Sequence, residues 1–136
     1  MTSPPTPDIT PGDLRTRQPA IRTIAMPADT NPAGDIFGGW LMAQMDLAAS
    51  NVAMLRVRGR CATVAVDRMS FLRPVRVGDE VSLYADVVRV GHTSLDVEVE
   101  AWRRSRDGHE SSQVTHARFT FVALDANGAP RAIPQA

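Results

Sequence analysis

One long apolar stretch limits the folds that this chain of 136 residues can adopt. Between Asp35 and Arg56 the only ionisable side chain is that of Asp46. The pattern predicts a helix over residues 38–55, and a helix that is apolar on most of its circumference packs inside a domain. A carboxylate is costly at such a place unless it is paired, hydrogen-bonded or used in chemistry. Asp46 is therefore the first candidate for a functional residue.

The segment before the predicted helix offers a second chemical group. Residues 34–39 read GDIFGG, and the backbone N–H groups at a helix start have no partner within the helix. Hydrolysis of an ester-like bond needs at least a base or nucleophile, which a buried carboxylate can provide, and oriented N–H donors that stabilise the oxyanion. Gly38 and Gly39 are thus candidate oxyanion donors, although the same glycines also allow close packing of helix on strand. Asp35 either orients water or holds the loop.

The rest of the sequence has the pattern of strands and turns. Strands are predicted at about residues 21–26, 62–72, 81–90, 95–101 and 114–124. Short turns favour antiparallel neighbours, and the mixed periodicity of 62–72 indicates a strand covered on both faces. The predicted class is α+β, with one long central helix wrapped by a curved antiparallel sheet of five to six strands. A second copy of the chain is expected to cover the part of the helix that the sheet leaves open.

Composition excludes several classes of partner and chemistry. Fifteen basic and fifteen acidic residues give a net charge of zero, which argues against nucleic acid or an anionic membrane as the main partner. All basic residues are arginine, so Schiff-base chemistry on lysine is excluded. Cys61 is the only cysteine, which favours a reducing, cytoplasmic setting. The three histidines, His92, His109 and His116, lack metal-ligand spacing, and no metal is expected.

The sequence divides into a short leader and one domain. Residues 1–19 are rich in proline and are predicted to form a disordered leader, neither a signal peptide nor a transmembrane segment. Residues 20–136 are predicted to form a single domain, which is the size that one hydrophobic core supports.

Several motifs together carry a family resemblance. Asp29-Thr30-Asn31, then GDIFGGWLM at 34–42 and QMD at 44–46, resembles the signature of hotdog-fold acyl-CoA thioesterases of the YciA type. Further matches follow in order along the chain, at residues 63–66, 71–75, 77–79, 91–94 and 119–123. The matches run from about Arg22 to Pro134. A lone Gly-Gly before a helix is weak evidence, whereas an ordered set of motifs over this length is specific.

The resemblance implies an activity, a site and an assembly. It implies hydrolysis of acyl-CoA to CoA and a carboxylic acid, without metal or cofactor, by Asp46 acting as general base or as nucleophile. The polar loop residue of related two-domain enzymes falls on Asp35, where those relatives carry asparagine. Known members form dimers and often trimers of dimers. The residues that the resemblance places at coenzyme A are Arg73, Arg89, Gly91, Thr93 and Ser94, where arginines and exposed N–H groups would bind phosphate.

Spacing along the helix predicts that the active site is shared between two chains. Gly39 and Asp46 lie seven positions apart, which is roughly 10 Å at about 1.5 Å per residue. One thioester carbonyl cannot easily contact both. Two antiparallel helices across a two-fold axis would place Asp46 of one copy opposite Gly39 of the other.

Two other functions are known to fit a hotdog fold. A hotdog hydratase is expected to use a histidine with a carboxylate, and no histidine precedes His92. A non-catalytic acyl-CoA sensor on the same fold needs an output module, and only about 19 proline-rich residues precede the predicted fold. The sensor remains the alternative to the thioesterase. Chain-length preference is not reported by any motif.

Overall fold

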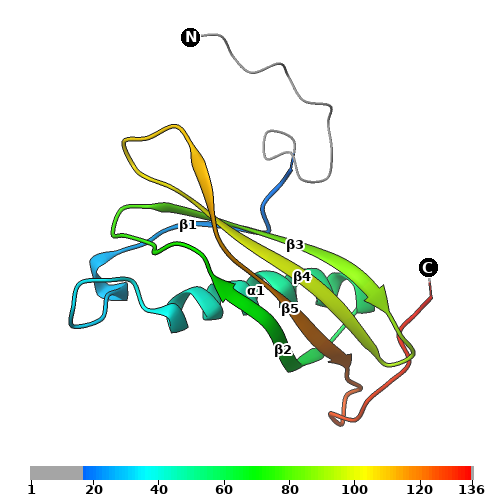
Figure 1. Cartoon of the computed structure of the whole chain (residues 1–136). Coiled ribbons are helices and arrows are strands. Elements are labelled where there is room, and N and C mark those ends of the chain that lie inside the picture. Colours follow the sequence, from blue (N-terminus) through cyan, green and yellow to red (C-terminus); the bar gives the residue numbers. More distant parts are fainter. Residues whose placement is uncertain (1–16, 136) are drawn as a thin grey trace, which may run out of the picture.

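The computed structural model describes residues 17–135 and consists of one helix on one sheet. The helix, α1, runs from Gly38 to Val57, two residues beyond the predicted end. The strands are β1 (Ile21–Ile24), β2 (Cys61–Phe71), β3 (Glu80–Val90), β4 (Ser94–Arg104) and β5 (Ser111–Ala123), with a short 3-10 turn at Pro27–Asp29. Figure 1 shows α1 lying along one face of the curved sheet. Most of the predicted leader, residues 1–16, lies outside the described residues.

All five strands are antiparallel, in the order β1-β3-β4-β5-β2. The prediction that short turns join neighbouring strands is correct for β3, β4 and β5 but wrong for β2. This strand pairs with β5 instead of β3, because the link over residues 72–79 contains Pro74 and is long enough to cross to the other edge. β2 is therefore an edge strand (Figure 1).

The core lies between α1 and the inner face of the sheet. The helix buries Leu41, Met45 and a row of small residues that ends at Val57. Alternate residues of β4, from Leu95 to Ala101, are buried against the helix, in agreement with the predicted alternation. Phe119 and Phe121 on β5 stack with their ring centroids 6.4 Å apart.

Apolar surface remains exposed on two elements. β2 is exposed at most of its positions, so the prediction that it is covered on both faces is wrong for a single chain. Val64 is 57% exposed on β2, and on α1 Leu47 is 56% and Leu55 82% exposed. A single chain thus leaves part of the helix and one sheet edge uncovered, which favours association with another molecule.

Candidate active site

The start of α1 presents two N–H groups without an acceptor among the described residues. The carbonyl of Phe37 accepts hydrogen bonds from the N–H groups of Trp40 and Leu41, at 3.1 and 3.3 Å. No side chain caps this end. The N–H groups of Gly38 and Gly39 therefore point outward at the positive end of the helix. Apart from its chain neighbours and the backbone of the helix itself, no heavy atom of the described residues lies within 4 Å of the place that a Cβ on Gly39 would occupy, so the space beside Gly39 is open.

The loop before the helix is held by Asn31. Its Oδ1 accepts hydrogen bonds from the N–H groups of Ala33 and Asp35, at 3.0 and 3.1 Å. Its own N–H donates to the carbonyl of Asp35 at 2.7 Å. The side chain of Asp35 is exposed and has no hydrogen-bond partner within residues 17–135. The backbone of Asp35 thus takes part in the loop, while its carboxylate is left free.

Asp46 contacts β2 through a residue that sequence reasoning did not single out. Thr63 Oγ1 donates a hydrogen bond to Asp46 Oδ1 at 2.6 Å, a length typical of a hydroxyl bound to a charged acceptor. Asp46 is half-buried in the single chain. Thr63 adjoins a register shift in β2, and bulges of this kind often re-aim a side chain next to a site. Ser50, one helical turn after Asp46, donates to the carbonyl of Leu47 at 3.1 Å.

Cys61 lies near Asp46 but is poorly suited to nucleophilic attack. Burial raises the pKa of the Cys61 thiol, and the Asp46 charge adds to this rise, while Arg131 opposes it. A raised pKa keeps the sulfur protonated at neutral pH, whereas a reactive cysteine needs the thiolate. Asp46 therefore remains the better candidate for the reacting group.

An apolar groove of about 370 Å³ opens beside the helix start. Phe71 at the end of β2 packs there, 3.7 Å from the place of a Cβ on Gly38. Arg73 lines the groove, and its Nη1 donates to the carbonyl of Gln113 at 2.7 Å. The other apolar lining residues are Ile36, Phe37, Leu41, Leu72, Pro74, Val75 and Val114.

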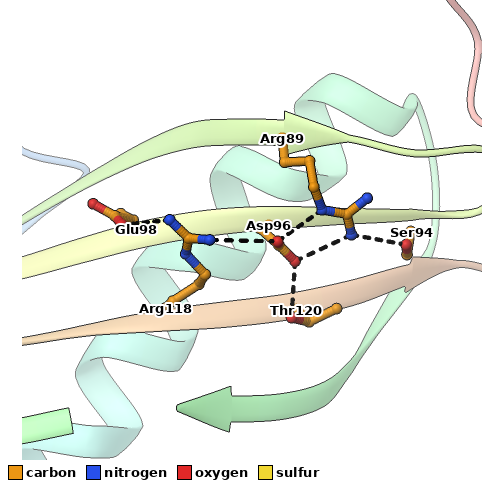
Figure 2. Close-up of polar contacts among 6 residues, drawn as sticks. All are labelled: Arg89, Ser94, Asp96, Glu98, Arg118 and Thr120. Atoms are coloured by element: carbon orange, nitrogen blue, oxygen red, sulfur yellow. Dashed lines mark hydrogen bonds and ion pairs between the residues drawn. The ribbon is translucent and has the colours of Figure 1, made fainter. Parts of the chain in front are cut away.

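The guanidinium of Arg89, predicted to bind phosphate, forms hydrogen bonds and an ion pair within the chain. Figure 2 shows it on the outer face of the sheet, where Arg89 Nε lies 2.8 Å from Asp96 Oδ2 and Nη2 lies 3.1 Å from Ser94 Oγ. Asp96 Oδ1 also accepts a hydrogen bond from Thr120 at 2.8 Å. The hydrogen bond from Arg89 is the main cause that lowers the pKa of the Asp96 carboxyl. The charge of Arg89 is thus largely compensated.

The turn between β3 and β4 also differs from the prediction. The Gly91 N–H, expected to be open to phosphate, donates to the carbonyl of Ser94 at 2.7 Å. The Thr93 carbonyl accepts from the N–H of Ala123 at 2.9 Å. Arg89, Gly91, Thr93 and Ser94 are brought together, but Arg73 is not among them.

Arg73 lies at the opposite end of the sheet. Its N–H donates to the carbonyl of Val114 at 3.4 Å, whereas Ser94 pairs with Val122. These two β5 residues are eight positions apart, roughly 27 Å along a strand. Within one chain the predicted coenzyme A residues therefore form two separate groups.

Two further findings concern metals and membranes. Within residues 17–135, no group of three or more His, Cys, Asp or Glu side chains is arranged to hold a metal ion. No helix in this part of the chain is both long and apolar enough to cross a membrane.

Comparison with known proteins decides the family. A family model described as the thioesterase superfamily matches residues 33–108, which include α1, β2 and the site just described. The chain belongs to this superfamily. The acyl-CoA thioester hydrolase YciA of Escherichia coli is 48% identical over 126 residues, covering 90% of this chain and 92% of that protein. The resemblance to YciA-type thioesterases is thereby confirmed.

Solved structures of other thioesterases have the same fold. A hexameric thioesterase from Yersinia pestis is 46% identical with a TM-score of 0.85, covering 89% of this chain and 98% of that one. A hexameric hotdog-fold thioesterase of Campylobacter jejuni is 40% identical with a TM-score of 0.81, covering 87% and 91%. The predicted hotdog fold is confirmed, with a sheet of five strands in the described residues.

Proposed function

We propose that this thioesterase hydrolyses acyl-CoA to CoA and a free carboxylic acid, and that Asp46 is its catalytic carboxylate. The observation that carries the proposal is the fixed carboxylate. Thr63 holds Asp46 Oδ1 at 2.6 Å, while Oδ2 has no partner among residues 17–135. The hydrolase name of the relative from Escherichia coli supports the substrate.

Two routes fit one free carboxylate oxygen. As a general base, Asp46 takes a proton from water while the water oxygen attacks the thioester carbonyl; the C–S bond then breaks, and CoA leaves as the thiolate, which the proton held by Asp46 can neutralise. As a nucleophile, Asp46 itself attacks, CoA thiolate leaves, and water then hydrolyses the mixed anhydride. In both routes negative charge develops on the thioester oxygen. The N–H groups of Gly38 and Gly39 would stabilise this charge, and neither route needs a metal or cofactor.

The active site is proposed to combine residues of two chains. Asp46 and Gly39 are roughly 10 Å apart along one helix, too far for one carbonyl to meet both. An antiparallel two-fold pair of α1 helices brings Asp46 of one chain to Gly39 of the other. The exposed apolar residues of α1 and β2 supply a surface for this pairing. Because two solved relatives are described as hexameric, a trimer of dimers is the proposed assembly. The proposed location is cytoplasmic, and a single unpaired cysteine, Cys61, is in keeping with it.

A release assay tests the function. Purified protein is mixed with acetyl-, butyryl-, hexanoyl- and palmitoyl-CoA, and free CoA is measured with a thiol reagent. We expect turnover of at least one substrate, and a loss of about 10²- to 10⁴-fold in kcat for Asp46→Asn.

The control for this assay is Asp107→Asn, which makes the same change in the exposed loop between β4 and β5 and should keep wild-type turnover. Tight acyl-CoA binding without turnover would favour the sensor. Activity of Asp46→Asn within twofold of wild type would remove Asp46 from the mechanism.

A further inference from the structure

The turn between α1 and β2 is short, because only residues 58–60 separate the two elements. Arg58 has φ +58°, a left-handed conformation that ends the helix, and the N–H groups of Arg58 and Gly59 both donate back into its last turn. A turn of this length sets the direction in which β2 leaves the helix. Thr63 is the third residue of β2, and Asp46 lies about three turns before the end of α1. The hydrogen bond between these two side chains therefore depends on the turn.

Arg131, in the segment that follows β5, contacts this turn. Its Nη2 donates to the Val57 carbonyl at 2.8 Å, and its Nε donates to the Leu124 carbonyl at 3.0 Å. Val57 is buried and is the last residue of α1, and the last carbonyls of a helix have no partner within the helix. Arg131 Nη2 also lies 2.8 Å from the place that a Cβ on Gly59 would occupy. One guanidinium thus joins the end of the helix, the turn and the residue that follows β5.

The segment that carries Arg131 is itself fixed to the sheet. The Arg131 N–H donates to the Ala123 carbonyl at 2.9 Å, and the Ile133 N–H donates to the His92 carbonyl at 2.8 Å. The side chain of Ile133 belongs to the hydrophobic core. Figure 1 shows this segment turning back past the end of the sheet. The guanidinium therefore extends from an anchored backbone.

Arg131 and Asp46 both lie near the start of β2. Cys61, the first residue of β2, pairs with Ala123, whose carbonyl accepts the hydrogen bond from the Arg131 N–H. Burial raises the pKa of the Cys61 thiol, while the charge of Arg131 lowers it and that of Asp46 raises it, so both charges are close to this residue. Two positions further on, Thr63 donates to Asp46. Because hydrogen bonds weaken steeply as their geometry departs from the optimum, a shift of the turn would loosen the hold on Asp46.

We propose that Arg131 is a positioning residue of the active site, acting through the turn and Thr63 on the carboxylate of Asp46. By bridging the Val57 and Leu124 carbonyls, the guanidinium fixes the angle between α1 and β2, and this keeps the Thr63 hydroxyl within reach of Asp46. Lysine replaces it only in part, because an ammonium is a compact point charge, whereas the planar guanidinium donates in several fixed directions. The assignment rests on the proposed function for the role of Asp46.

A double-mutant cycle tests the coupling between Arg131 and Thr63. Steady-state kinetics are measured for wild type, Arg131→Gln, Thr63→Val and the double variant, with folding checked by circular dichroism. Arg131→Gln should lower kcat by about tenfold with KM nearly unchanged, and Arg131→Lys should restore part of the rate. Adding Thr63→Val to Arg131→Gln should lower kcat by less than about twofold more, because the hydrogen bond is already weakened.

Arg56→Gln is the matched control. It makes the same change in an arginine whose side chain donates, within the described residues, to the exposed Pro134 carbonyl, and it should keep wild-type kcat. If Arg131→Gln does not fold, the cycle is run on Arg131→Lys, where a smaller but equally coupled loss is expected. Losses that multiply in the double variant would overturn the proposal and leave Arg131 with a role in stability alone.

Crystal structures of the Arg131 variants provide a measurement that needs no turnover. The distance between Thr63 Oγ1 and Asp46 Oδ1 should exceed about 3 Å in Arg131→Gln, which is the limit for a good hydrogen bond between two oxygens. A distance that stays at the wild-type 2.6 Å would contradict the proposal. Absence of acyl-CoA turnover in wild type, together with the lengthened contact in the variant, would refute the proposed function and leave the positioning of Asp46 by Arg131 standing.

Discussion

At the scale of single residues, the proposed chemistry depends on how Asp46 is held. Its carboxylate lies on a helix whose neighbouring residues carry no charge, and one hydrogen bond from Thr63 connects it to β2. That bond occupies Oδ1 and leaves Oδ2 without a partner among residues 17–135. We propose Thr63 as a positioning residue that acts through Asp46.

Removing the hydroxyl of Thr63 should slow the reaction without preventing binding. Thr63→Val keeps the shape of the side chain on an exposed strand position but cannot donate the hydrogen bond. We expect kcat to fall by about tenfold, with KM nearly unchanged, because an interaction worth about 1.4 kcal/mol is lost mainly in the transition state. Steady-state kinetics compare it with Thr63→Ser, which should restore most of the rate. Equal kcat in Thr63→Val and wild type would show that the contact has no positioning role.

At the scale of elements, one buried carboxylate links three strands on the outer face of the sheet. The carboxylate of Asp96 on β4 accepts hydrogen bonds from Arg89 on β3 and from Thr120 on β5, and so connects three strands (Figure 2). Its side chain is only 10% exposed. The sequence marks Asp96 merely as the polar position of an alternating strand. No local pattern specifies the strand pairing that places Asp96 beside Arg89. The resulting cross-strand ion pair engages the Arg89 guanidinium, which is then less available to a phosphate.

This arrangement predicts a pH-dependent contribution to stability. The pKa of Asp96 is lower in the folded protein than its usual value of about 3.9, so its contribution is fully present above that value and is lost as pH falls through the folded pKa. At pH 7, Asp96→Asn should lower the free energy of unfolding by about 1–3 kcal/mol. The difference from wild type should shrink below about pH 4.

Urea unfolding at fixed protein concentration measures this difference, since dissociation of an oligomer would otherwise enter the result. Glu98→Gln is the control, because Glu98 is half-exposed in its pair with Arg118 and should cost no more than about 1 kcal/mol. A difference for Asp96→Asn that stays constant from pH 7 to pH 3 would contradict the ion-pair account.

At the scale of the whole molecule, local pattern predicts the elements better than their arrangement. The uncharged stretch locates α1 to within two residues, and the alternation in β4 identifies its buried face correctly. The place of β2 is not predictable in this way, because pairing with β5 is a long-range contact. The same limit applies to the site. The candidates Asp46, Gly38 and Gly39 can be picked out from their own positions in the sequence, whereas the contact between Thr63 and Asp46 depends on segments that meet only in the fold.

Each active site is proposed to take Asp46 from one chain and its oxyanion donor from another. Asp46→Ala removes the carboxylate, and Gly39→Pro removes the N–H at a first-turn position where proline is tolerated. Each variant alone should be nearly inactive. The two variants are mixed in equal amounts, unfolded and refolded together, with folding checked by circular dichroism and assembly by light scattering. Random pairing makes about half of the dimers mixed, and each mixed dimer has one intact site, so about a quarter of wild-type activity should return. If both variants fold and assemble but the mixture remains inactive, the active site does not combine Asp46 and Gly39 from different chains.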